Sequence, residues 1–146
     1  MVQKGTNRAI ERIEYEITTF IRHAVYKEKT DKKIGFLDRS IYLLLRNLEE
    51  SGPARLKTLA ERFKLDISTL SRQASTAEAK GFISRSKDSS DGRGSVFQIT
   101  PLGRENLLAD KKGRIERFQN MLQEWSVDEQ ELFADLLSSL NDSFIE

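Results

Sequence analysis

The sequence predicts a mainly α-helical protein with one small β-hairpin. Apolar residues recur every three or four positions along most of the 146 residues, which is the period of an amphipathic helix. The pattern changes between residues 82 and 99, where two short runs of β-branched and aromatic residues flank a polar loop that contains glycine. A chain of this length corresponds to about one domain, so we expect residues 1–146 to form a single domain.

The first third of the chain predicts two helices joined by a charged connector. Residues 1–7 are expected to be a loose arm, and residues 26–35 carry the lysines of the connector. Asp38 can cap the second helix, and the Ser-Gly-Pro of residues 51–53 ends it. The apolar face of the first helix consists of Ile10, Ile13, Ile17, Phe20, Ile21 and Ala24. That of the second helix consists of Ile41, Leu44, Leu45 and Leu48.

Two short helices with a tight turn between them follow. Residues 64–66 form the turn, and Asp66 is a good N-cap for a helix that ends at Gly81. The inward positions of the first short helix are Leu56, Leu59, Ala60 and Phe63. Those of the second are Leu70, Ala74 and Ala77, at i, i+4 and i+7. Two short helices joined by three or so residues form a helix-turn-helix arrangement.

The hairpin follows directly and leads into two more helices. Residues 82–86 and 95–99 are expected to pair as strands around the polar loop of residues 87–94. Thr100 and Pro101 begin a long helix, in which Gly113 allows a bend. Ser126, Val127, Asp128 and Glu129 form a capping box that begins the last helix. The apolar faces of these helices consist of Leu107, Leu108, Ile115, Phe118, Leu122 and Trp125, and of Leu132, Phe133, Leu136, Leu137, Leu140 and Phe144.

The helices at the two ends of the chain are unusually apolar for surface helices. Leaving several large apolar side chains exposed is costly, because burying one contributes roughly 1.5–3 kcal/mol. We therefore expect residues 8–35 and 101–146 to be dimerisation helices that flank a compact central lobe at residues 38–100. The alternative is that these helices simply complete one core within the chain.

The composition excludes several classes of protein. There is no cysteine and one histidine, His23, which excludes disulfides, a thiol nucleophile and a zinc site built from Cys and His. Neither glycine-rich phosphate-binding motif occurs, so we expect no enzyme activity, no cofactor and no metal. The longest apolar run, residues 41–45, is too short for a membrane span of about 20 residues or a signal peptide. A cytoplasmic protein without membrane contact is expected.

The charge is unevenly distributed although its net value is +1. Residues 55–104 carry ten lysines and arginines against five acidic residues, whereas residues 105–146 carry four against ten. A basic centre is typical of a chain that contacts phosphates. The alternative is ordinary surface charge without a binding role.

The second short helix carries the best candidate binding surface. With its apolar seam inward, its outward side is rich in hydroxyls and has one guanidinium and one amide. Short hydroxyls can bond phosphates and base edges, arginine can pair with guanine and glutamine with adenine, which suits a helix in the DNA major groove. These residues are Ser68, Thr69, Ser71, Arg72, Gln73 and Ser75. Outward faces of this composition also occur on ordinary helices.

The hairpin carries a second candidate. Arg85, Lys87 and Arg93 lie on or beside its loop, and Arg93 stands between two glycines. An arginine at such a tip can enter a narrow minor groove, where the negative potential attracts guanidinium groups. Asp91 is placed to orient Arg93. The alternative is surface charge on a solvated turn.

The order of these motifs resembles the multiple-antibiotic-resistance regulator (MarR) family. The resemblance rests on LAERF at residues 59–63, STLSR at 68–72, KGFISR at 80–85, DGR at 91–93 and ITPLG at 99–103. It implies a winged helix-turn-helix fold and a homodimer that binds a pseudo-palindromic operator in double-stranded DNA. It further implies a recognition helix over Ser68 to Gln73 and a wing arginine, Arg93, supported by Asp91. Family members commonly release DNA on binding a small aromatic molecule. Others sense oxidants through a cysteine, a mechanism that this chain cannot use because it has no cysteine.

We therefore expect a DNA-binding transcriptional regulator, with repression favoured over activation. Phe20, His23, Tyr26, Phe36, Tyr42 and Phe118 could line a pocket for a small aromatic effector, although core and dimer packing is the favoured explanation of these residues. Two alternatives stay open: a winged helix used for protein contacts without DNA binding, and a DNA-binding protein that responds to no ligand.

Overall fold

The computed structural model describes residues 4–30, 37–87 and 94–144, and of residues 4–7 only the backbone. The chain divides into two compact units, residues 1–36 and residues 37–146, and each is described by itself. The described part of the first unit is one helix, α1 (Lys4–Thr30).

Helix α1 is longer than the sequence predicts at both ends. It begins at Lys4, so the loose arm expected at residues 1–7 is wrong for residues 4–7. It ends at Thr30, so the first residues of the expected connector are helical, while residues 31–35 of the connector lie outside the described residues. Lysine and glutamate are good helix formers, and Lys27 and Lys29 in the last turn complement the negative end of the helix dipole.

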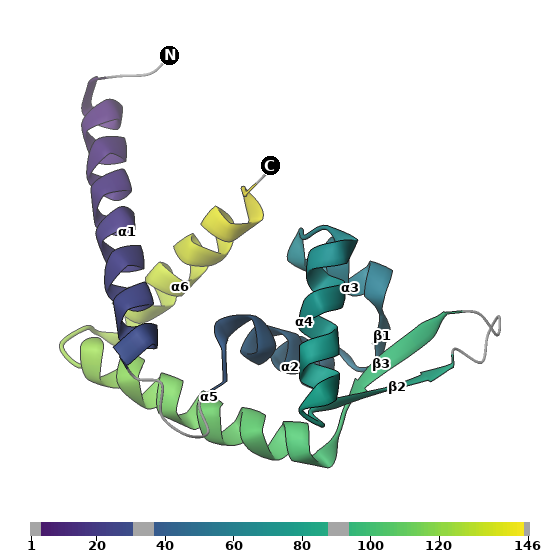
Figure 1. The fold of residues 1–146 in the computed structure, drawn as a ribbon. Coiled ribbons are helices and arrows are strands. Elements are labelled where there is room, and N and C mark those ends of the chain that lie inside the picture. Colours follow the sequence, from purple (N-terminus) through teal and green to yellow (C-terminus); the bar gives the residue numbers. More distant parts are fainter. Residues whose placement is uncertain (1–3, 31–36, 88–93, 145–146) are drawn as a thin grey trace. The chain divides into compact units, whose positions relative to one another are not determined.

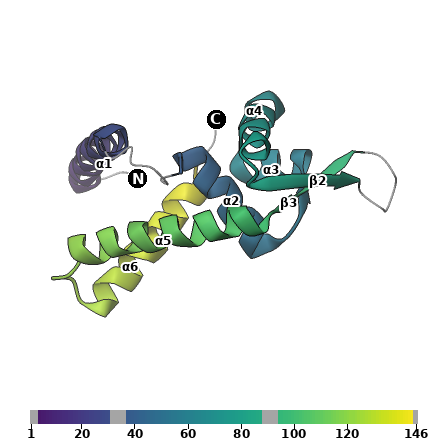
Figure 2. The same cartoon turned by 60° about the horizontal axis from the view of Figure 1, so that its bottom comes forward.

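The second unit is a set of helices around a small antiparallel sheet (Figure 1). Its elements are α2 (Arg39–Ser51), β1 (Ala54–Arg55), α3 (Leu56–Phe63), α4 (Ile67–Ala79), β2 (Ile83–Lys87), β3 (Ser95–Ile99), α5 (Pro101–Met121) and α6 (Val127–Asp142). The predicted fold class, mainly helical with a small β-hairpin, is thus confirmed. In Figure 2 the β2–β3 hairpin and α5 run in opposite directions from the point where they meet.

The sheet has one more strand than the sequence predicts. Its strand order is β1-β3-β2, and Ala54 pairs with Phe97 while Arg55 pairs with Val96. A strand of two residues has no side-chain periodicity of its own, so sequence patterning cannot reveal it. Its effect is to tie the chain between α2 and α3 to the base of the hairpin.

The core of the second unit lies where α2, α3, α4 and the sheet meet. Leu44, Leu45, Leu59, Leu70 and Leu107 are essentially inaccessible to solvent. The predicted inward residues of α2 and α4 are buried, while Leu56 and Phe63 of α3 are half-buried and pack against this core. The core therefore encloses the helix-turn-helix and leaves one side of α4 facing outward.

The predicted helix caps at Asp66, Thr100 and Ser126 are confirmed, whereas the predictions for Asp38 and Gly113 are corrected. Thr100 Oγ1 accepts from Gly103 N at 3.0 Å, and Ser126 and Glu129 form the expected capping box. Asp38 holds the N-cap position of α2 but accepts from Tyr42 through its backbone oxygen, and within the described residues its side chain makes no capping bond. Helix α5 passes Gly113 without interruption, because one glycine costs a helix only about 1 kcal/mol.

Many apolar side chains of α5 and α6 are exposed in the second unit. They include Leu108, Ile115, Phe118, Leu132, Phe133, Leu136, Leu137 and Leu140, and Phe144 just beyond α6 is also exposed. Within residues 4–30, 37–87 and 94–144, no helix has the length and hydropathy needed to cross a membrane.

Candidate nucleic-acid interface

Helix α4 is held by its small apolar seam and presents its opposite side to solvent. Leu70, Ala74 and Ala77 are buried, and α4 packs against α2 and α3 through them. Of the residues predicted to read DNA, Ser68, Arg72 and Ser75 are exposed, and Thr69, Ser71 and Gln73 are half-buried. The structure thus brings the six predicted residues together on one helix, with those nearest the seam less accessible.

The first turn of α4 is fixed by Asp66. One carboxylate oxygen accepts from Thr69 N at 2.6 Å and from Ser68 Oγ at 2.9 Å. Hydrogen bonds from Thr69 lower the pKa of Asp66 below its ordinary value, and the hydrogen bond from Ser68 makes a smaller contribution in the same direction. Arg72 Nη2 lies 3.4 Å from Thr69 Oγ1, a long contact that leaves the guanidinium exposed. The cap therefore sets the direction of the turn from which Arg72 projects.

The hairpin lies next to the C-terminal end of α4. Arg85 pairs with Phe97 and Lys87 with Ser95 in the β2–β3 ladder, and Lys87 is exposed at the end of β2. Arg85 donates to both carboxylate oxygens of Glu78, the residue before the last of α4. The Glu78–Arg85 contact therefore joins the end of α4 to the middle of β2. The predicted tip residues Asp91 and Arg93 lie outside the described residues.

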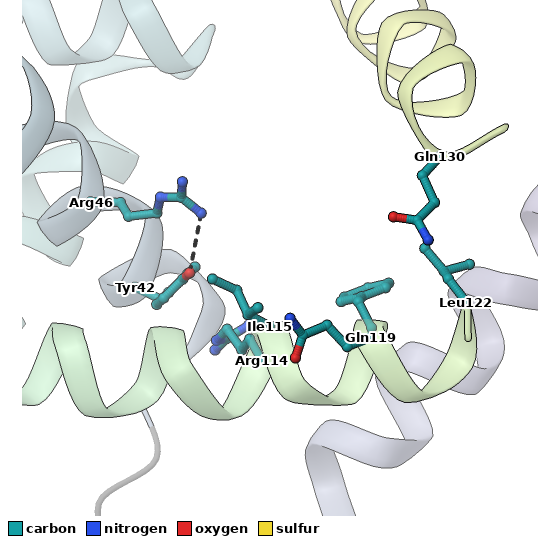
Figure 3. Close-up of a pocket in the computed structure, with 8 residues that line it drawn as sticks. Tyr42, Arg46, Arg114, Ile115, Gln119, Leu122 and Gln130 are labelled. Atoms are coloured by element: carbon teal, nitrogen blue, oxygen red, sulfur yellow. Dashed lines mark hydrogen bonds between the residues drawn. The ribbon is translucent and has the colours of Figure 1, made fainter. Parts of the chain in front are cut away.

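A pocket of about 700 Å³ opens between α2, α5 and α6 (Figure 3). Of the residues predicted to line a ligand site, Tyr42 and Phe118 line this pocket. Phe20, His23 and Tyr26 lie on α1 in the first unit, and Phe36 lies outside the described residues. The other lining residues are Arg46, Arg114, Ile115, Gln119, Leu122 and Gln130.

Two arginines lie beside Tyr42 in the pocket, and each is paired with a carboxylate. Arg46 Nη1 donates to the Tyr42 hydroxyl at 3.3 Å, and its Nε donates to Glu50 at 2.8 Å. The guanidinium of Arg114 lies 4.0 Å from the centre of the Tyr42 ring and its Nε is 3.3 Å from Asp110. The hydrogen bond to Glu50, the largest cause, raises the pKa of Arg46.

Sequence reasoning missed these arginines although a signal was present. Arg46 is four residues after Tyr42, and Arg114, Phe118 and Leu122 are also spaced by four, so each set shares one helix face. The predicted pocket consists of aromatic residues and one histidine, and it does not include the arginines that share helix faces with Tyr42 and Phe118. Among the residues that the structure describes, no three His, Asp or Glu side chains are grouped to hold a metal ion.

Known proteins that resemble this chain are transcriptional regulators. The sequence pattern of the MarR family matches residues 37–95. The HTH-type transcriptional regulator YxaD of Bacillus subtilis is 58% identical over 137 residues, which are 94% of this chain and 96% of that protein. The solved structure of the regulator SlyA is 26% identical with a TM-score of 0.75, over 89% of this chain and 92% of that one.

The fold agrees with this relationship. The structure of a MarR family protein from Bacillus stearothermophilus, at 18% identity, superposes with a TM-score of 0.74 over 97% of both chains. Proteins of this family bind DNA through a winged helix-turn-helix and are not enzymes. Residues 56–99 of this chain have that fold, with α3 and α4 as its helix pair and β2 and β3 as its hairpin. The chain therefore belongs to the MarR family of DNA-binding transcriptional regulators.

Proposed function

We propose that this protein is a homodimeric repressor that binds a pseudo-palindromic operator and releases it on binding a small aromatic molecule. The observation that carries the DNA-binding part is the outward side of α4, where Ser68, Arg72 and Ser75 are exposed opposite a buried seam. Small side chains let the helix backbone approach the base edges in the major groove, and the guanidinium can hydrogen-bond to a base.

Specific roles follow from the chemistry of each side chain. Arg72 pairs with a guanine and Gln73 with an adenine, while Ser68, Thr69, Ser71 and Ser75 bond phosphates or base edges. In the wing, Lys87 contacts phosphates and Arg93, oriented by Asp91, enters the minor groove.

The dimer is proposed to form through the helices at the two ends of the chain. Residues 8–35 and 101–146 would pair two copies, and residues 38–100 would form each DNA-binding lobe. Support comes from the exposed apolar side chains of α6, since Leu132 and Leu136 are 60% and 59% exposed in one chain. A second copy would cover them and set two recognition helices about 34–36 Å apart, one turn of DNA.

The pocket between α2, α5 and α6 is the proposed effector site. Its volume of about 700 Å³ lies in the range of small-molecule sites, and Tyr42 and Phe118 offer aromatic surfaces. Arg46 and Arg114 favour a ligand with an acidic group.

Selection of bound sequences from random duplexes, followed by salt titration, tests the DNA-binding proposal. Affinity for the selected operator should fall steeply between about 50 and 200 mM salt. Arg72→Ala should cost about 1–3 kcal/mol of discrimination at one base pair. Arg72→Lys is the matched control, because it keeps the charge but loses the bidentate geometry. It should therefore retain binding to random DNA and lose the discrimination.

Two further measurements separate the remaining parts. Purified protein should run as a dimer and reduce transcription in vitro from a promoter that contains the selected site. Aromatic acids and phenols should raise the unfolding temperature and release the operator. A monomer that binds no duplex at low salt would overturn the proposal as a whole.

A further inference from the structure

Glu78 and Arg85 form a two-point contact between the recognition helix and the wing. Glu78 lies at the end of α4 and Arg85 in the middle of β2. Arg85 Nε donates to Glu78 Oε2 at 3.0 Å and Arg85 Nη2 donates to Glu78 Oε1 at 2.8 Å. Two parallel hydrogen bonds fix the relative orientation of the two planar groups, which a single bond does not.

The guanidinium also contacts the second strand of the wing. Its central carbon lies 4.9 Å from the centre of the Phe97 ring, and Phe97 is the ladder partner of Arg85 on β3. Phe97 is buried in the core of the lobe. One arginine therefore connects α4, β2 and β3. Pairing with Arg85 also lowers the pKa of Glu78, so both groups are charged at neutral pH.

The remaining connection between α4 and β2 is short and turns sharply at Gly81. Gly81 has a φ of 82°, and Phe82 N donates to Ala77 O at 3.0 Å on one side of the turn. These contacts hold the base of the hairpin, but they lie before the point at which the strands extend away from the lobe. The Glu78–Arg85 pair is a second attachment further along β2, and two separated attachments resist rotation better than one.

We propose that the Glu78–Arg85 pair is a brace that sets the direction of the wing relative to the recognition helix, so that Arg85 is a positioning residue and not a phosphate contact. This inference rests on the proposed placement of α4 and the wing on DNA. The brace fixes the spacing at which the major-groove and minor-groove contacts are made together.

A double-mutant cycle with Glu78→Gln, Arg85→Gln and the double variant tests the brace on DNA. Each single variant should weaken operator binding by about threefold to tenfold, and the double variant should be no weaker than the weaker single. The dependence of affinity on salt should stay unchanged in all three. If Arg85 instead contacts a phosphate, Arg85→Gln will reduce the salt slope by about 1 and Glu78→Gln will tighten binding, which would overturn the inference.

Arg104→Gln is the matched control. Arg104 forms a similar ion pair with Glu49, and its side chain is 46% exposed against 47% for Arg85, but the pair joins α5 to α2. It should leave operator affinity unchanged. A loss equal to that of Arg85→Gln would show that the brace is an unspecific contribution to folding.

A measurement without DNA keeps this inference separate from the proposed function. Because the chain has no cysteine, spin labels can be placed on Lys57→Cys and Ser86→Cys, two exposed positions on α3 and β2. Their distance distribution should broaden in Glu78→Gln and Arg85→Gln and not in Arg104→Gln. A distribution that stays narrow in all variants overturns the brace, whereas failure of the unaltered protein to bind any duplex overturns only its placement on DNA.

Discussion

The lobe formed by α2, α3, α4 and the sheet differs from the C-terminal arm, residues 108–144, which contains most of α5 and all of α6. Both regions contain amphipathic helices, but the apolar faces are buried in the lobe and exposed in the arm. In the lobe, the side chains of Leu44, Leu45, Leu59 and Leu70 on α2, α3 and α4 are fully buried. In the arm, Leu132 and Leu136 are 60% and 59% exposed although they recur with the same period. An amphipathic pattern therefore shows that a face needs covering, and only the tertiary structure shows what covers it. The lobe covers itself, and we propose that a second chain covers the arm.

The largest effect is expected in the lobe. Leu59→Ala removes a side chain that is fully buried between α3 and the rest of the core, and the cavity should cost about 2–5 kcal/mol of unfolding free energy. Urea titration followed by circular dichroism measures it. Leu65→Ala, at an exposed leucine in the adjacent turn, is the control and should cost much less. Equal losses would mean that the lobe core does not carry the stability.

Two glycines in α5 sharpen the boundary between the two regions. A Cβ on Gly103 would overlap the backbone oxygen of Phe82, so Gly103→Ala should cost about 1–3 kcal/mol. A Cβ on Gly113 meets nothing within 4 Å among the described residues, so Gly113→Ala should stabilise by up to about 1 kcal/mol through helix propensity. Thermal unfolding of both variants gives the comparison. A stable Gly103→Ala would contradict the close approach of α5 to the wing.

Local signals in the sequence account for most of the lobe. The seam of α4 and the caps at Asp66, Thr100 and Ser126 involve residues within one or two turns of each other, so periodicity and cap chemistry predict them. The predicted C-terminal end of α1 is too early. The charged residues after Tyr26 are also good helix formers, and no glycine or proline interrupts them before residue 31, so the helix continues to Thr30.

Contacts between elements are what the sequence could not predict. The Glu78–Arg85 pair depends on the turn at Gly81, which brings a helix end beside a strand. Glu78 lies in a helix and Arg85 in the strand that follows it, so the spacing rules for a single helix or a single hairpin do not indicate the pair. Arg114 likewise meets Tyr42 only because α5 packs against α2. The six residues predicted on α4 do lie on one helix, whereas the sequence does not indicate which residues of other elements contact that helix.

After the glycine variants in size comes an expected effect on dimerisation, at the exposed apolar face of α6. If a second chain covers α6, Leu136→Glu should raise the dimer dissociation constant at least about tenfold, because it introduces a charge into an apolar interface. Sedimentation equilibrium measures it. Ser138→Glu adds the same charge two residues later, on the opposite side of the helix, and should leave the dimer intact. An unchanged dimer in both variants would place the interface elsewhere.

The smallest effect tests whether the arm also depends on its own local bonds. Ser126 Oγ accepts from Glu129 N at 3.1 Å, and Glu129 Oε1 accepts from Ser126 N at 2.8 Å. Ser126→Ala should therefore lower the unfolding free energy by about 1 kcal/mol. Ser138→Ala, in the middle of α6, should be neutral or slightly stabilising because alanine favours a helix interior. Hydrogen exchange at the backbone amides of α6 measures both. If Ser126→Ala leaves this exchange unchanged, the helix is held by what covers its apolar face and not by its cap.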